Sequence, residues 1–129
     1  MKPEKRFAVV IHPDTTIEIV ETAGGVDEIH RLVGGHFENV YSTNFHVFPI
    51  VVSVNDIGKL IGLAFNPLGT LLHNNPYDFL VGHVVILKLE RVGEFDELDQ
   101  LPMTKFEANI LKAHLILLNK KAEKAKNNF

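Results

Sequence analysis

The sequence contains no cysteine among its 129 residues. This absence excludes disulfide bonds, thiolate nucleophiles and cysteine-ligated zinc or iron–sulfur sites. No apolar run approaches the roughly 20 residues that a membrane-spanning helix requires. The apolar stretch from Phe7 to Ile11 is also too short for the core of a secretory signal peptide. These absences predict a cytoplasmic protein that does not enter a membrane.

Motifs of the common catalytic and metal sites are also missing. The seven histidines form no His-Glu-x-x-His pair, and neither Ser42 nor Ser53 has the glycine neighbours of a nucleophile elbow. His36 and Glu38 share one face of an expected strand, but a third metal ligand would have to come from elsewhere in the fold. We therefore expect no catalytic residue, no metal site and no cofactor.

The charge of the chain is mildly negative, with a net value of −3. Lysines are concentrated in residues 119–129, so the remainder of the chain is more acidic than the total suggests. Contacts with phosphates supply most of the affinity of nucleic-acid-binding proteins, and they require a basic surface. The charge distribution thus argues against nucleic acid as a partner.

Composition and hydrophobic patterning predict a single α+β domain over residues 1–129. The apolar fraction of 46% suits a globular chain of this size. Alternating apolar and polar residues indicate strands, and apolar residues three to four apart indicate helices. Strands are expected over residues 5–12, 16–21, 36–42, 48–54, 60–63 and 79–90, and helices over residues 26–33, 66–72 and 104–125.

These elements predict a mainly antiparallel sheet of about six strands in the order β-β-α-β-β-β-α-β-α, with a long C-terminal helix over one face. Residues 79–90 are apolar at nearly every position, which indicates a central strand buried on both faces. Residues 93–100 carry four acidic side chains and are expected to form a solvated loop.

The C-terminal helix begins with a capping box of Thr104 and Glu107. Its apolar residues form two stripes, whereas one stripe is enough to dock a helix on its own sheet. The partner of the second stripe is the helix over 26–33 or a second subunit. We favour a homo-oligomer with Leu111, Leu115 and Leu118 at the interface. One stripe comprises Phe106, Ile110, Ala113 and Leu117, and the other Leu111, Leu115, Leu118 and Ala122.

Four segments resemble the motifs of a small family of domains of unknown function that is common in phage, prophage and plasmid genomes. The segments are Leu32 to Val40, Asn55 to Leu60, Gly62 to Asn66 and Tyr77 to Gly82. The resemblance covers about residues 7–90 and departs from the family pattern at Ala64, where proline is usual. It implies a phage or mobile-element origin and no established activity.

A ligand site is predicted around Asn66 and Asp78. Aromatic residues with a few polar groups are the usual make-up of a small-molecule pocket. Packing explains these aromatics equally well, and Asn66 also suits a helix N-cap. The candidate ligand-binding residues are Asn66, Asp78, Phe65, Tyr77 and Glu38.

Three functions remain in order of preference. The first is a phage or mobile-element accessory protein that acts as a non-catalytic binding module and sequesters a small nucleotide-like ligand. Anti-defence proteins that sequester cyclic nucleotides have a similar size and genomic setting, an analogy of context only. The second is an inhibitor that binds a host enzyme through the C-terminal helix and the basic tail at 126–129. An enzyme ranks last.

Overall fold

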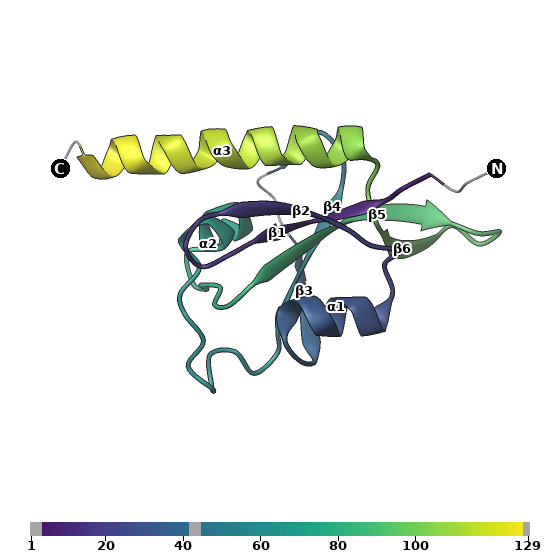
Figure 1. The fold of residues 1–129 in the computed structure, drawn as a ribbon, viewed down its shortest axis with the longest axis horizontal. Helices are drawn as coiled ribbons and strands as arrows, with labels where there is room; N and C mark the ends of the chain where they lie inside the picture. The colour runs from purple at the N-terminus through teal and green to yellow at the C-terminus, as the bar shows by residue number, and fades with distance from the viewer. Residues whose placement is uncertain (1–3, 42–44, 128–129) are drawn as a thin grey trace.

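The structure is a computed structural model that describes residues 4–41 and 45–127. It contains one sheet with helices on both faces (Figure 1). In chain order the elements are β1 (Phe7–Ile11), β2 (Ile17–Glu21), α1 (Val26–Val33), β3 (Phe37–Tyr41), β4 (Ile50–Asn55), α2 (Pro67–His73), β5 (Val84–Val92), β6 (Glu97–Leu101) and α3 (Lys105–Asn127).

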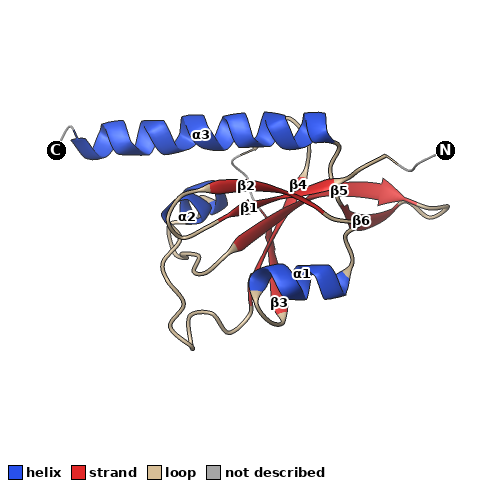
Figure 2. Cartoon of the chain, viewed as in Figure 1, coloured by secondary structure: helices blue, strands red, loops and turns tan. Residues whose placement is uncertain are grey.

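The sheet is antiparallel throughout, with the strand order β2-β1-β5-β4-β3 and with β6 paired to β5 (Figure 2). β5 is the central strand, as its continuous apolar sequence predicts. Its first half lies between β1 and β4, and its second half extends beyond β1 to pair with β6.

Two hydrophobic clusters lie on opposite faces of the sheet. Val9 and Ile11 of β1 belong to the cluster under α2 and α3, whereas Ala8 and Val10 belong to the cluster under α1. Successive side chains of a strand point to opposite faces, so a strand that is apolar at every position serves both clusters. α1 covers this second face of the sheet (Figure 1).

The α+β class, the six-stranded antiparallel sheet and the long C-terminal helix are confirmed. Two elements lie elsewhere than predicted. Residues 60–63 form turns rather than a strand, and β6 lies in the segment that was expected to be an acidic loop. Leu60 and Ile61 are apolar but exposed, which misleads a prediction from hydropathy. β6 is an edge element, where charged side chains are common because they discourage pairing with other chains.

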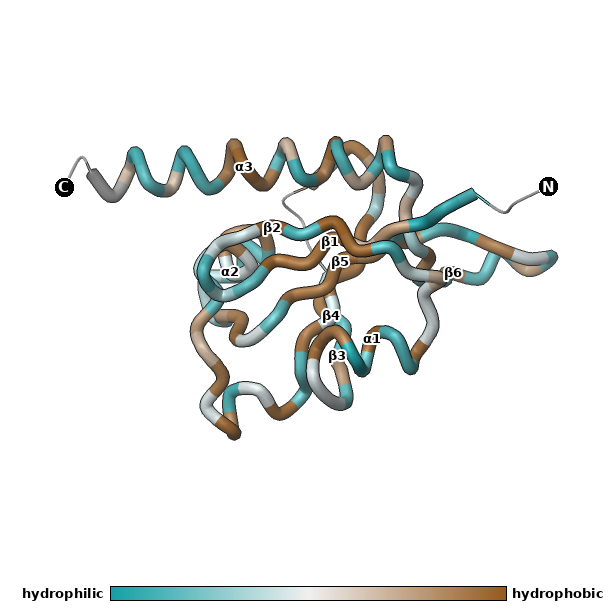
Figure 3. Tube along the Cα trace, viewed as in Figure 1, coloured by the Kyte–Doolittle hydropathy of each residue, from teal (hydrophilic) through white to brown (hydrophobic). Residues whose placement is uncertain are grey.

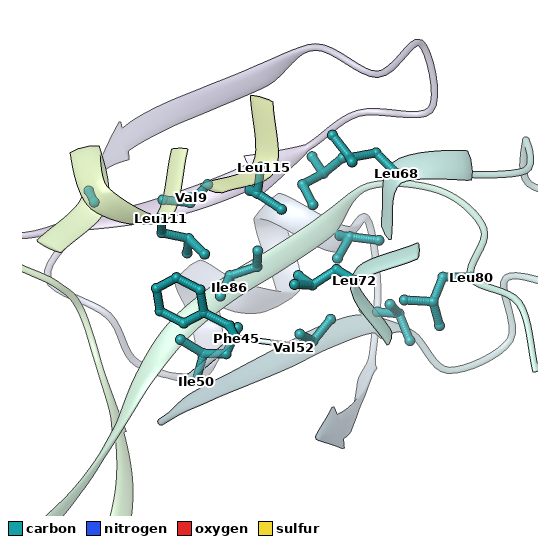
Figure 4. Packing of buried hydrophobic residues seen from close by; sticks show 14 of the residues in the cluster. Val9, Phe45, Ile50, Val52, Leu68, Leu72, Leu80, Ile86, Leu111 and Leu115 are labelled. Carbon is teal, nitrogen blue, oxygen red and sulfur yellow. The ribbon is translucent and has the colours of Figure 1, made fainter. Parts of the chain in front are cut away.

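The stripe of α3 that was predicted to meet a second subunit packs instead on the sheet. Leu111 and Leu115 are fully buried against the sheet, where they point into the cluster of Val9, Ile86 and Phe45 (Figure 4). They are therefore unavailable to a second subunit, which corrects the predicted interface. Leu118 is half-buried and packs on the same cluster.

The rotation of α3 about its axis is fixed by the residues that precede it. Met103 exchanges two backbone hydrogen bonds with Phe7, at 2.8 and 2.7 Å. The predicted capping box is present, since Thr104 N donates to Glu107 Oε1 and Glu107 N donates to Thr104 Oγ1. Glu107 also forms an ion pair of 2.7 Å with Lys88 of β5. These contacts place the stripe of Leu111 over the sheet.

No helix in the described part of the chain is long and apolar enough to cross a membrane. α3 continues to Asn127, so the predicted tail at 126–129 begins inside the helix, and residues 128–129 lie outside the described part.

Candidate ligand-binding pocket

The loop that follows β4 is held in a compact turn by its own backbone and by Asn55. The Asn55 side-chain oxygen accepts a hydrogen bond of 3.0 Å from Ile57 N, and the Asn55 carbonyl accepts one of 3.2 Å from Gly58 N. A Cβ at Gly58 would lie 2.9 Å from the Val81 side chain. Only glycine lets this turn approach the segment before β5 so closely.

A second pair of contacts joins the end of this loop to residues 80–82. Gly82 N donates to the Ala64 carbonyl at 2.7 Å, and Asn66 N donates to the Leu80 carbonyl at 2.9 Å. Gly82 has a φ of +73°, a conformation that favours glycine. Residues 56–65 and 78–82 therefore lie together although they are far apart in the sequence.

Asn66 is completely buried, and its side chain is fully engaged. Its amide nitrogen donates to the carbonyls of Ile11 and Gly82 at 2.9 and 2.8 Å, and its oxygen accepts from Gly69 N at 2.8 Å as the N-cap of α2. The prediction that Asn66 contacts a ligand is wrong, because its hydrogen-bonding groups serve the fold.

A cavity of about 240 Å³ opens between the post-β4 loop, residues 78–81 and the edge strand β3. Its lining combines carboxylate groups, one amine and one amide with apolar side chains. The lining residues are Glu38, Val54, Asn55, Asp56, Ile57, Lys59, Leu60, Asp78, Phe79, Leu80 and Val81.

Asp78 is the centre of a hydrogen-bond network at the wall of the cavity. Its Oδ1 forms an ion pair with Lys59 and accepts a hydrogen bond of 3.0 Å from Phe79 N. Its Oδ2 lies 3.0 Å from Nε2 of His73, which is buried at the end of α2. The Lys59 ammonium, followed by the His73 ring, holds the pKa of Asp78 below its ordinary value despite partial burial. Asp78 is therefore a fixed anion at neutral pH.

The aromatic side of the cavity comes from Phe79. The Lys59 ammonium lies 4.5 Å from the centroid of the Phe79 ring, a cation–π contact. Phe65 packs edge-on against Phe79 with ring centroids 6.1 Å apart. Tyr77 is 96% exposed and does not line the cavity.

A family model described as a domain of unknown function, DUF3846, matches residues 4–110. The chain belongs to this family. The match extends beyond the predicted span of 7–90 and includes β6 and the first residues of α3. It therefore contains the whole cavity. Comparison with curated proteins and with solved structures gave no match.

Within this DUF3846 domain, the structure brings together only part of the predicted site. Glu38 and Asp78 line one cavity although they come from β3 and from the loop before β5. Phe65 packs against Phe79, which lines the cavity, but is not itself a lining residue. Asn66 and Tyr77 do not line the cavity either. The sequence analysis did not single out Lys59, although this residue lies in the segment Asn55 to Leu60, one of the four that carry the family resemblance.

The rim of the cavity in the DUF3846 domain exposes several large apolar side chains. Leu60 is 85% exposed, and Ile57, Ile61 and Phe79 each expose about half of their surface. Figure 3 shows brown, hydrophobic positions along this loop, which lies outside the sheet and the helices. Exposed apolar groups around a polar cavity are typical of a binding surface.

Among the residues with a described placement, no group of three or more His, Asp or Glu side chains is arranged to hold a metal ion. The cavity of the DUF3846 domain thus presents hydrogen-bond acceptors, one cation and an aromatic ring. This arrangement can orient a polar ligand and cover its flat face.

Proposed function

We propose that this DUF3846 protein is a non-catalytic binding module whose ligand enters the cavity beside Lys59 and Asp78. The observation that carries the proposal is the convergence of Glu38, Lys59 and Asp78 from three separate segments on one cavity with an exposed aromatic wall. Few, well-placed polar groups among apolar walls are the usual chemistry of recognition sites.

The charges of the cavity favour a ligand that donates hydrogen bonds. Glu38, Asp56 and Asp78 outnumber Lys59, whose ammonium is already paired with Asp78. A phosphate inside the cavity would be repelled by the surplus of carboxylates. The amino and ring N–H groups of a nucleobase would instead meet acceptors, and its face would meet Phe79.

The size of the cavity also favours entry of the base-like end of the ligand rather than of the whole ligand. Its volume of about 240 Å³ is below the roughly 300–1,000 Å³ of pockets that enclose whole ligands. A nucleobase-like end therefore occupies the cavity, while the sugar and phosphates of a nucleotide-like ligand remain outside. In the phage or mobile-element setting that the resemblance implies, such a cytoplasmic protein acts by sequestering its ligand.

Isothermal titration calorimetry with adenine, guanine, cytosine and uracil nucleosides and their monophosphates tests the proposal. We expect at least one nucleoside to bind, with its monophosphate no tighter, and the Glu38→Gln variant to bind about tenfold more weakly. Glu94→Gln, in the exposed turn between β5 and β6, is the matched control and should bind normally. Binding of phosphate alone, or equal affinity in both variants, would contradict the proposal.

A second candidate function, binding of another protein through α3, is favoured by the apolar residues that the helix leaves uncovered. Phe106 is 74% exposed and Leu117 is 59% exposed, and these two residues lie on the same face of the helix. The C-terminal end of α3 also projects beyond the body of the domain (Figure 1). A second copy of the chain or a host enzyme would cover this stripe.

Sedimentation velocity of the wild-type chain and of a Phe106→Glu, Leu117→Glu double variant tests self-association. A homo-oligomer predicts that the wild-type mass exceeds that of one chain and that the double variant is a folded monomer. Lys112→Glu, a charge change on the same helix outside the stripe, is the control. A wild-type monomer at high concentration would remove the homo-oligomer and leave the stripe to a different protein.

A further inference from the structure

The hairpin of β5 and β6 carries an unbalanced negative charge. In its register Glu90 lies opposite Asp99 and Val92 lies opposite Glu97, so the three carboxylates share one face of the hairpin. Like charges directly opposite each other destabilise a pair of strands. Glu90 has Lys88 at 3.7 Å, whereas no ion pair within the described part of the chain includes Glu97 or Asp99. A cation from another molecule would relieve this repulsion.

The tip of the same hairpin exposes an aromatic ring. Phe95 is 80% exposed, and the acidic residues on either side of it, Glu94 and Asp96, are exposed as well. A large apolar side chain that is surrounded by charged groups and left in solvent is typical of a contact with another molecule. We call residues 90–99 the acidic hairpin.

The C-terminal part of α3 has the opposite charge. Residues 117–125, which we call the basic helix end, contain three lysines and one acidic residue, Glu123. At about 100° per residue, Leu117, Lys120 and Lys124 share one face of the helix. All three are exposed, Leu117 by 59%. Neither lysine takes part in an ion pair within the residues that the structure describes.

The acidic hairpin and the basic helix end lie at opposite ends of the molecule (Figure 1). α3 begins beside the hairpin, where Glu107 forms an ion pair with Lys88 of β5, and then runs away from it to Asn127. The two surfaces therefore cannot meet within one chain. Each combines an exposed apolar side chain with charges that the other surface complements.

We propose that the acidic hairpin of one copy of the chain docks on the basic helix end of a second copy. In this contact Phe95 packs against Leu117, while Glu94 and Glu97 face Lys120 and Lys124 across the interface. Exposed ion pairs are individually weak, so the apolar contact supplies the attraction and the charges select the orientation.

The contact joins two different surfaces and is therefore heterologous. Repetition of such a contact produces a ring when the rotation between copies closes, and an open chain of copies when it does not. The proposal rests on the second candidate function, since it names the partner of α3 and the surface that this partner presents. It is independent of the cavity beside Lys59, which shares no residue with either surface.

Sedimentation velocity at low and high salt tests the contact on the full chain and on two charge-reversed variants. The helix variant is Lys120→Glu, Lys124→Glu, and the hairpin variant is Glu94→Lys, Glu97→Lys. We expect the wild type to have at least twice the mass of one chain in about 0.05 M NaCl and to dissociate in about 1 M NaCl, where charges are strongly screened. Each variant alone should be a monomer at low salt, with the circular dichroism of the folded wild type.

An equal mixture of the two variants gives the sharpest test. It should associate again at low salt, because each surface then finds an oppositely charged surface on the other variant. A symmetric contact between two α3 helices would instead leave the hairpin variant associated on its own. Asp27→Lys, which reverses an exposed charge on α1, is the control and should associate as the wild type does.

The outcomes separate this contact from self-association in general. A wild-type monomer at low salt would overturn both the contact and the homo-oligomer. Association that persists in the hairpin variant, or a mixture that stays monomeric, would overturn the head-to-tail contact and leave self-association to another surface.

Discussion

At the scale of single residues, Asn66 joins three segments of backbone at the centre of the fold. Replacing it by alanine leaves the carbonyls of Ile11 and Gly82 and the N–H of Gly69 without their partner in a buried site. Each unsatisfied group costs about 1–3 kcal/mol. We predict that Asn66→Ala lowers the free energy of unfolding by about 3–5 kcal/mol, measured by urea denaturation.

Asn75→Ala, in the exposed loop after α2, is the control and should cost less than about 1 kcal/mol. A stable Asn66→Ala protein that has lost only ligand binding would contradict the structural role and return Asn66 to the ligand site.

The ion pair of Asp78 makes a pH-dependent contribution to stability. Folding lowers the pKa of Asp78 from its ordinary value of 3.8, chiefly through Lys59. The stabilisation is thus fully present above that ordinary value and is lost as the pH falls through the lowered one. We predict that Lys59→Met raises the pKa of Asp78 and moves acid unfolding to higher pH, as measured by ¹³C NMR of the carboxyl group.

Lys59→Arg preserves the positive charge and should leave the pKa of Asp78 lowered. A carboxyl group that titrates at its ordinary value in the wild type, or is unaffected by Lys59→Met, would show that the pair does not form in solution.

At the scale of elements, α3 offers the clearest stability test, because its two stripes have opposite environments. Leu111 is fully buried and Leu117 is 59% exposed on the same helix. Leu111→Ala should cost about 2–5 kcal/mol of unfolding free energy through lost burial and a cavity. Leu117→Ala should cost less than about 0.5 kcal/mol in a monomer, as is usual for exposed positions. Guanidinium denaturation compares the two, and equal losses would contradict the observed rotation of α3.

Most helices and strands could be predicted from short stretches of sequence, because the interactions that form them or end them involve neighbouring residues. The capping box of Thr104 and Glu107 and the left-handed C-cap at Gly34 each depend on a few adjacent residues. The choice between the stripes of α3 depended on contacts between Met103 and Phe7, which lie about three quarters of the chain apart in the sequence. Such contacts leave no periodic signal in the sequence.

At the scale of the whole molecule, the candidate pocket exists because the fold joins three distant segments. The sequence identified Glu38 and Asp78 as polar residues beside apolar runs, but nothing in it linked them to Lys59. Asn66 was misassigned because the sequence does not distinguish two kinds of asparagine. One is buried and donates hydrogen bonds to backbone carbonyls, as Asn66 does, and the other contacts a ligand. Burial and tertiary hydrogen bonds distinguish the two roles.

The proposed function requires that the cavity beside Lys59 and Asp78 receive the base-like end of a small ligand. The most direct test is a ¹⁵N–¹H NMR titration with the tightest-binding nucleoside of the calorimetric panel. We expect the largest shifts at the backbone amides of Lys59, Asp78 and Phe79, with little change along α3. Shifts confined to α3 or α1, or no shift with any nucleoside, would contradict it.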